Sequence, residues 1–332
     1  MRYIFLLAAI CFLASCNNAD TQQVSFEANE KGNEALAKLF DQYWEDRLQL
    51  YPLEATQTGD HRYNDKLTIL FTDSFKDSLR HFYSSYLDSV NNYNRNELNE
   101  NDRLSYDIFK KEMEMQLEGL QLHTNYIPFN QFWGFPLDMG QLGSGQGSQP
   151  FHTVQDYKNW MSRARLFSAW SDSAIAYFKK GMNAHIVLPQ ALVVKMIPQM
   201  KDLANGDTSK SVFFGPLRKL PSGFSQAEKD SVAGELTAVI KTQVLPSYQK
   251  LAAFLQNEYL PKARHTTGIS ALPEGAKMYN YFVRFWTTTN TPADDIYHTG
   301  LAEVKRIRLE MERIKDSIGF KGDLRAFFEH LK

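Results

Sequence analysis

The clearest helical pattern in the chain is 291-TPADDIYHTGLAEVKRIRLEMERIKDSIG-319. Thr291 suits the cap of a helix, Pro292 suits its first turn, and Asp294 follows the cap by three residues. Gly319 is typical of the end of a helix. Between these signals, apolar residues that are expected to face inward recur at helical spacing: Ile296, Val304, Ile307, Met311, Ile314 and Ile318. The stretch therefore predicts one long helix with a buried face.

The same spacing recurs along most of the chain and predicts further helices. Thr153 with Asp156 resembles a capping box in front of one of them. Ser225 with Glu228 resembles a second capping box in front of a long helix. Pro246 lies inside that long helix and is expected to kink it.

No stretch shows convincing alternation of apolar and polar residues with hairpin turns between, so the predicted fold class is all-α, mainly helical. The segment 185-HIVLPQALVVKMI-197 is rich enough in β-branched residues to leave helix and strand both open. Two stretches, 125–150 and 205–224, are expected to be irregular. The first is long for a structureless loop, and such loops tend to be functional or mobile.

Composition excludes some classes of partner. The 332 residues contain 37 Lys and Arg against 38 Asp and Glu, which leaves a formal net charge of -1. Such a balance gives no overall field that favours nucleic acid, so no nucleic-acid partner is expected. The hydrophobic content of 43% is ample for a packed interior.

The beginning of the chain predicts a lipid anchor. Arg2 is followed by an apolar run of signal-peptide length, and Leu13-Ala14-Ser15-Cys16 resembles the bacterial lipobox. We therefore expect a signal peptide over 1–15, a lipidated Cys16 and flexible tether over 16–30, and a helical domain over 31–332. The protein would then be exported across the inner membrane and anchored by lipid in the periplasm, the outer membrane or the cell surface. The alternative is that Cys16 is an ordinary thiol near a conventional cleavage site.

The search for a catalytic or metal site gives few candidates. None of the eight histidines pairs with another at i, i+4, and H-E-x-x-H is absent, so no zinc site on one helix is predicted. Convergence of distant residues such as His152, His185 and His265 stays an alternative. The segment 143-GSGQGS-148 lacks the lysine of a Walker loop, so a flexible loop is favoured over a phosphate loop.

Charged residues give two structural expectations. Glu303 and Glu310 lie seven residues apart, but the spacing of Arg306 from Glu310 predicts a solvated, ion-paired face of the helix. A polar cluster at a helix end is expected from two segments: Trp44, Asp46 and Arg47 with Asp60, His61 and Arg62.

Five segments together resemble the N-terminal half of the bacterial family called domain of unknown function 885 (DUF885). They span nearly the whole mature chain in family order, and the segment 287–331 is the most specific. The segments are 43-YWEDRLQLYPLEATQTGDHRYNDKL-67, 103-RLSYDIFKKEMEMQLEGL-120, 128-PFNQFWG-134, 150-PFHTVQDYKNWMSRA-164 and 279-YNYFVRFWTTTNTPADDIYHTGLAEVKRIRLEMERIKDSIGFKGDLRAFFEHL-331.

The resemblance implies a zinc-metallopeptidase-like, lipid-anchored hydrolase in which a metal-bound water attacks a peptide carbonyl. The family motif H-E-x-x-x-G-H-H belongs to the C-terminal half, beyond Lys332, so zinc is expected only there and no catalytic residue is assigned here. Residues 31–332 would form a helical wall and lid opposite the metal, inactive alone, with the 125–150 stretch lining the cleft and the missing half as packing partner.

The alternative is a non-catalytic helical binding lipoprotein of the cell envelope. Reading the DNA after the Lys332 codon distinguishes the two, since only the first requires a continuous frame that encodes the metal motif. The first also predicts an exposed apolar patch around the end of the chain: Ile307, Met311, Ile314, Phe327, Phe328 and Leu331.

Overall fold

A computed structural model of the protein describes residues 31–332, and these residues form helices and no β-strand. Two chain segments pair only through an isolated parallel bridge between Pro189 and Arg264. The predicted all-α class is therefore confirmed. The predicted signal peptide over 1–15, Cys16 and the tether over 16–30 lie outside the described residues.

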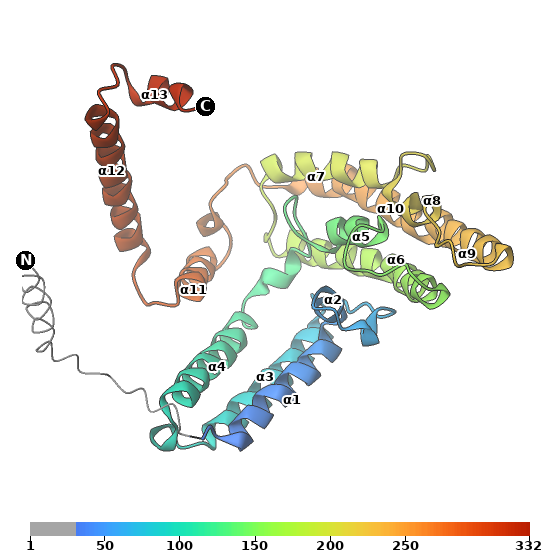
Figure 1. Cartoon of the computed structure of the whole chain (residues 1–332), viewed down its shortest axis with the longest axis horizontal. Coiled ribbons are helices and arrows are strands. Elements are labelled where there is room, and N and C mark those ends of the chain that lie inside the picture. Colours follow the sequence, from blue (N-terminus) through green and yellow to red (C-terminus); the bar gives the residue numbers. More distant parts are fainter. Residues whose placement is uncertain (1–30) are drawn as a thin grey trace, which may run out of the picture.

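The first group of helices forms an elongated arm (Figure 1). Tyr43 stacks on Phe82 with ring centroids 5.3 Å apart and meets Tyr86 and Phe109 edge-on. These rings tie the three long helices of the arm together, because an aromatic pair adds to the energy of burial. The helices are α1 (Glu34–Leu50), α2 (Pro52–Gln57), α3 (Asp73–Asn91) and α4 (Glu100–Gly119).

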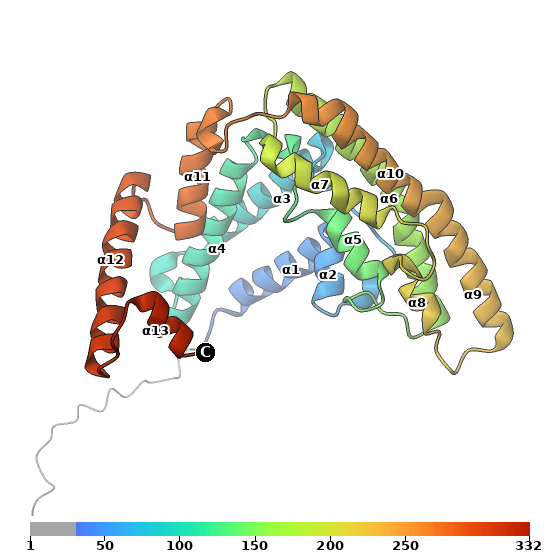
Figure 2. The same ribbon diagram turned by 90° about the horizontal axis from the view of Figure 1, so that it is seen from above.

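The second group surrounds the long central helix α6 (Val154–Asn183) and holds the largest core (Figure 2). Trp160 and Phe167 of α6 are buried, as is Tyr248 of a facing helix. Both predicted capping boxes are present, at Thr153 before α6 and at Ser225 before α9. The remaining helices of the group are α5 (Phe135–Gly143), α7 (Gln190–Leu203), α8 (Gly215–Arg218), α9 (Gln226–Val239) and α10 (Leu245–Phe254).

The helix expected after Ser225 changes its winding just before Pro246. A π-helical turn, Ile240–Val244, separates α9 from α10, and Pro246 occupies the first turn of α10. A proline has no N–H to donate, and the wider turn accommodates this loss. A second π-helical turn, Leu255–Tyr259, and a 3₁₀ turn, Leu260–Lys262, complete the segment.

Three sequence expectations about secondary structure are settled by the structure. The ambiguous segment 185–197 is mostly the helix α7. The stretch 125–150 was expected to be irregular, but it contains α5, which buries Phe135, Met139 and Leu142 on one face. The stretch 205–224 likewise contains a 3₁₀ turn and α8. Both stretches are rich in glycine and proline, which have low helix propensity, so the sequence did not predict these short helices. Their stability comes from packing against the rest of the protein.

The last part of the chain first contacts α4 through an ion pair of Arg284 with Glu118, and beyond residue 290 it projects from the body (Figures 1 and 2). It comprises α11 (Gly275–Thr287), α12 (Ala293–Ser317) and α13 (Leu324–His330). Helix α12 ends before Gly319 as predicted, but Pro292 rather than Thr291 stands at its cap position. It buries no residue within the described chain, so the expectation that its apolar residues face inward is wrong for residues 31–332.

Short 3₁₀ turns connect the helices: His61–Tyr63, Arg95–Glu97, His123–Tyr126, Val212–Phe214 and Ile269–Ala271. Over residues 31–332, no helix combines the length and the apolar character that crossing a membrane would require.

Gly181 marks a close approach of backbone to α6. A Cβ atom added there would lie 2.6 Å from the carbonyl oxygen of Ile186 and 2.9 Å from that of Tyr126. We expect Gly181→Ala to lower the free energy of unfolding by about 1–3 kcal/mol, because the backbone must shift. Gly234→Ala is the matched control, since its Cβ meets nothing within 4 Å. It should leave stability unchanged or raise it by up to about 1 kcal/mol in urea unfolding. Equal effects of the two changes would contradict this account.

Candidate functional site

An apolar cleft with a volume of about 480 Å³ lies where the first arm meets the central helices. We call it the central cleft. Its walls come from segments far apart in the chain, namely α3, the start of α5, α6 and the loops that precede α3 and α5. The apolar wall includes Leu67, Leu70, Phe71, Leu79, Trp133 and Trp170.

The 125–150 stretch supplies one rim of the central cleft through a tight turn. The side-chain oxygen of Asn130 accepts hydrogen bonds from the backbone N–H groups of Phe132 (2.8 Å) and Trp133 (3.1 Å). Gly134 follows with φ +131°, and a Cβ there would lie 2.2 Å from the Cβ of Phe129. Only glycine fits this position. The turn leaves the Trp133 side chain 58% exposed and that of Phe132 82% exposed.

Two ionisable side chains line this otherwise apolar cleft. Lys76 Nζ donates to the carbonyl oxygen of Leu122 (2.9 Å) and to Asn125 Oδ1 (3.3 Å), and burial lowers its pKa. Burial raises the pKa of the Asp138 carboxyl. Within residues 31–332 Asp138 makes no side-chain hydrogen bond to protein. Shifted pKa values in a cleft are common at functional sites. The sequence analysis did not single out either residue.

The described residues do not fit a zinc ion. No group of three or more His, Cys, Asp or Glu side chains within residues 31–332 lies close enough together to hold a metal. The alternative in which His152, His185 and His265 converge on a metal therefore finds no support in the geometry. Asp138 alone offers one carboxylate, which is not a ligand set of the kind that binds zinc.

The charged face of α12 is ion-paired, but with partners other than those expected. Arg306 contacts Glu303 (2.8 Å) rather than Glu310, and Glu310 contacts Arg313 (2.5 Å). These are i, i+3 pairs in solvent, which contribute little to stability. Glu303 and Glu310 therefore belong to a solvated face and not to a paired carboxylate site.

The predicted polar cluster is only partly formed. Arg62 bridges Glu45 (2.8 Å) and Asp60 (2.5 Å), which joins α1 to the 3₁₀ turn after α2. Arg47 instead pairs with Glu54 (2.9 Å) of α2. The two arginines thus serve separate contacts, both of which position the first arm.

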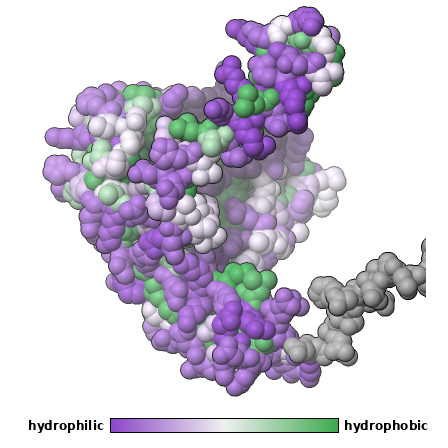
Figure 3. Space-filling model, turned by 90° about the vertical axis from the view of Figure 1, so that its left-hand side faces the viewer, coloured by the Kyte–Doolittle hydropathy of each residue, from purple (hydrophilic) through white to green (hydrophobic). Residues whose placement is uncertain are grey.

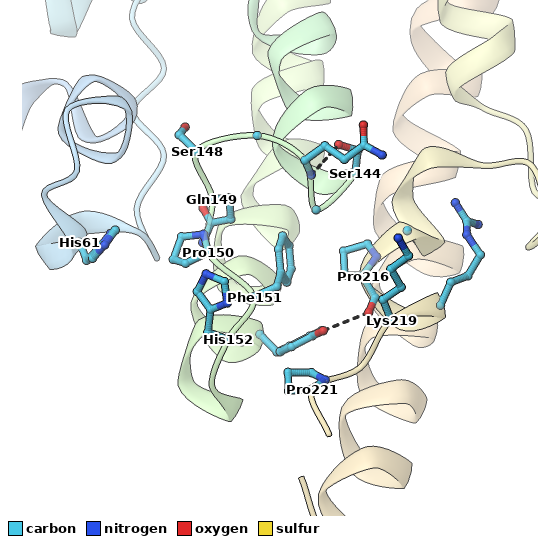
Figure 4. A pocket seen from close by; sticks show the side chains of 16 residues that line it. His61, Ser144, Ser148, Gln149, Pro150, Phe151, His152, Pro216, Lys219 and Pro221 are labelled. Carbon is cyan, nitrogen blue, oxygen red and sulfur yellow. Dashed lines mark hydrogen bonds between the residues drawn. The ribbon is translucent and has the colours of Figure 1, made fainter. Parts of the chain in front are cut away.

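A second cleft, of about 730 Å³, is lined by the glycine-rich loop 144–152 and by the segment around α8 (Figure 4). We call it the glycine-loop cleft. The 3₁₀ turn after α2 contributes His61, and the loop contributes His152. The favoured expectation for 143–148 was a flexible loop, yet the structure ties its far end into a buried network.

Arg163 of α6 is the centre of that network and is fully buried. Its guanidinium donates to Gln149 Oε1 (2.6 Å), to Thr56 Oγ1 (2.9 Å) and to the carbonyl oxygens of Tyr63 (2.7 Å) and Lys66 (2.8 Å). Burial lowers the pKa of Arg163 to about 10. One side chain therefore fastens the arm, α6 and the glycine-rich loop together. Sequence analysis missed it, since its partners lie up to 107 positions away.

The sequence matches the family described as "Bacterial protein of unknown function (DUF885)" over residues 52–332. The chain belongs to the DUF885 family. This confirms the family resemblance over most of the chain. No curated protein matches the sequence.

Two solved structures resemble the fold. A "putative lipoprotein" from Colwellia psychrerythraea aligns with a TM-score of 0.76 and 19% identity, over 87% of this DUF885 chain and 52% of that one. A "putative lipoprotein of unknown function" from Shewanella oneidensis aligns with a TM-score of 0.61 and 16% identity, over 85% and 48%. The chain therefore spans about half the length of these relatives, and the likeness shows its fold.

Proposed function

We propose that residues 31–332 form the substrate-facing, N-terminal helical wall of a lipid-anchored hydrolase that resembles zinc metallopeptidases. Residues 31–332 do not fit a zinc ion, so the proposal places the catalytic centre outside them. The observation that supports the proposal most strongly is the apolar face of α12, which no part of residues 31–332 buries.

That face is a continuous stripe along α12, which we call the α12 stripe. Its members follow one another at intervals of three or four residues, the spacing of a seam that packs on another helix. Their side chains are 38–67% exposed: Tyr297, Leu301, Val304, Ile307, Met311, Ile314 and Ile318. Figure 3 shows the hollow between this projecting part and the body, with apolar surface reaching into it.

Leaving such a stripe in water is costly. Each large apolar side chain that stays exposed forgoes roughly 1.5–3 kcal/mol of burial. Several such losses are comparable with the ~5–15 kcal/mol by which a domain is stable. We propose a further part of the same polypeptide as the packing partner of the α12 stripe. The greater length of the solved relatives supports this choice.

The central cleft supports the substrate part of the proposal. Its wall is mainly apolar, and Trp133 stands at the rim with its ring in solvent. An apolar side chain of a peptide is the ligand that suits such a surface, since clefts of this kind bind through buried apolar area and a few polar groups. Asp138 and Lys76 are then positioned to meet polar groups of the peptide.

Titration with peptides tests the substrate part. Residues 17–332 are mixed with blocked pentapeptides that carry a central Leu or a central Gly, and tryptophan fluorescence is recorded. We expect a saturable change with the Leu peptide only. Most of it should be lost in Trp133→Phe and kept in Trp286→Phe, a control whose side chain is 77% exposed on α11. No response, or a response that survives Trp133→Phe intact, would refute peptide binding in the central cleft.

Metal analysis tests where the catalytic centre lies. Purified residues 17–332 should hold no stoichiometric zinc and show no chelator-sensitive peptidase activity, because no preformed ligand set exists in residues 31–332. Elemental analysis after dialysis and cleavage of a fluorogenic peptide mixture give the readout. Tight, stoichiometric zinc would show that scattered residues do assemble a site and would move the centre into this chain.

The lipid anchor has its own test, at a residue outside the described range. Cys16→Ala should release the protein from the membrane fraction and abolish labelling by a fatty-acid probe. Stable attachment requires more than one acyl chain, so removal of the acylated cysteine should leave little residual binding. Ser15→Ala keeps the cysteine and serves as the control. Unchanged labelling of Cys16→Ala would refute lipidation.

A further inference from the structure

We propose that the glycine-loop cleft binds an anionic group, a carboxylate or a phosphate, at a site separate from the central cleft. The proposal stands independently of the hydrolase assignment, because it rests on different residues. Four observations support it: the charge of the lining, the packing of the loop, the free backbone donors and a buried donor without a partner.

The charge of the lining is one-sided. The side chains that line the glycine-loop cleft include His61, His152, Arg218 and Lys219 and no Asp or Glu. Figure 4 shows His61 and Lys219 on opposite sides, with His152 between them. Two carboxylates lie close to this lining in sequence, and both have partners: Asp60 pairs with Arg62 (2.5 Å), and Asp156 accepts from the backbone N–H of His152 (3.0 Å). Anions are therefore the ligands that this lining favours.

The loop is held in place by close backbone packing. A Cβ on Gly215 would lie 2.2 Å from the carbonyl oxygen of Ser144, so the loop and the start of α8 touch directly. Gly145 has φ +76°, a conformation that favours glycine. At the other end, Gln149 is 2% exposed and accepts from Arg163 (2.6 Å). The loop is thus fixed at both ends, as a binding loop needs to be.

The backbone offers donors along this loop. The N–H group of Gln146 donates to Ser144 Oγ (3.1 Å). The backbone N–H groups of Gly145, Gly147 and Ser148 donate to no protein atom within residues 31–332. Consecutive N–H groups that are free in a glycine-rich turn form concave sites for anions. A carboxylate or phosphate placed there would also meet the cationic side chains.

The last observation points to a missing acceptor. Gln149 lines the cleft, and its Nε2 is buried without a hydrogen-bond partner among the described residues. A buried donor that stays unsatisfied costs about 1–3 kcal/mol. An oxygen of a bound anion, or a water held by that anion, would satisfy it.

Calorimetric titration of residues 17–332 with inorganic phosphate and, separately, with succinate at constant ionic strength tests the proposal. We expect saturable binding of at least one probe. Lys219→Gln should weaken it about tenfold, because a charge-assisted hydrogen bond is lost. The Lys219 side chain is exposed and makes no hydrogen bond or ion pair within residues 31–332, so the variant should retain its thermal stability. Lys241→Gln, an exposed lysine on the π-helical turn, is the control.

The two probes separate the possible sources of the anion. Binding of phosphate alone assigns a phosphate ligand, binding of succinate alone assigns a carboxylate, and binding of both assigns a general oxyanion site. The proposal is overturned if neither probe binds, or if Lys219→Gln and Lys241→Gln weaken binding equally, since equal weakening would mean a diffuse effect of net charge.

Discussion

Replacing Arg163 by methionine is expected to lower the free energy of unfolding by about 3–5 kcal/mol. Within residues 31–332 the guanidinium pairs with no carboxylate and instead donates to four buried or half-buried oxygens. Methionine fills much of the space but donates nothing, so oxygens such as those of Gln149 and Thr56 lose a donor, at about 1–3 kcal/mol for each group left unsatisfied.

Arg165→Met is the matched control, since Arg165 lies two residues further along the same helix and is exposed. It should change stability by no more than about 0.5 kcal/mol. Urea unfolding followed by circular dichroism measures both variants, and an unchanged slope would show that only stability has altered. Similar midpoints for the two variants would mean that the buried network does not hold the arm, the central helix and the glycine-rich loop together.

The second large effect is expected on the α12 stripe. Val304→Glu combined with Ile307→Glu should abolish most hydrophobic-dye binding by residues 17–332 while changing the unfolding free energy little. The two side chains are 67% and 42% exposed, so little burial within residues 31–332 is lost. In a packed core, by contrast, the same two substitutions would bury unpaired charges and lower the free energy of unfolding strongly.

Leu309→Glu is the control for the stripe. Leu309 is 61% exposed on the same helix, but helical spacing places it on the face opposite the stripe. Dye binding should therefore remain. A severe loss of stability in the double variant would show that the stripe is covered within this chain, and equal loss of dye binding in both proteins would show that no particular face matters.

Local signals in the sequence predicted local structure well. The capping boxes at Thr153 and Ser225 form because each needs only residues three positions apart. The helix α12 was predicted for the same reason. The prediction that its apolar face is buried is wrong for residues 31–332, because periodicity identifies an apolar face but does not identify what covers it.

The features that were missed depend on distant parts of the chain. Helix α5 forms in a glycine- and proline-rich stretch because Phe135 and Met139 pack into the main core. The Arg163 network joins segments about a hundred positions apart, and an arginine in sequence usually indicates a solvated face. Asp138 and Lys76 line the same cleft only because the fold places α3 and α5 on its walls. No spacing rule could have brought these residues together.

Sedimentation velocity of residues 17–332 over a range of protein concentrations measures whether the α12 stripe requires a packing partner beyond these residues. We expect a helical protein that self-associates as its concentration rises, with association suppressed in the Val304→Glu and Ile307→Glu double variant. A single monomeric species at all concentrations, equally for both proteins, would contradict it and would favour a binding lipoprotein that functions without a further half.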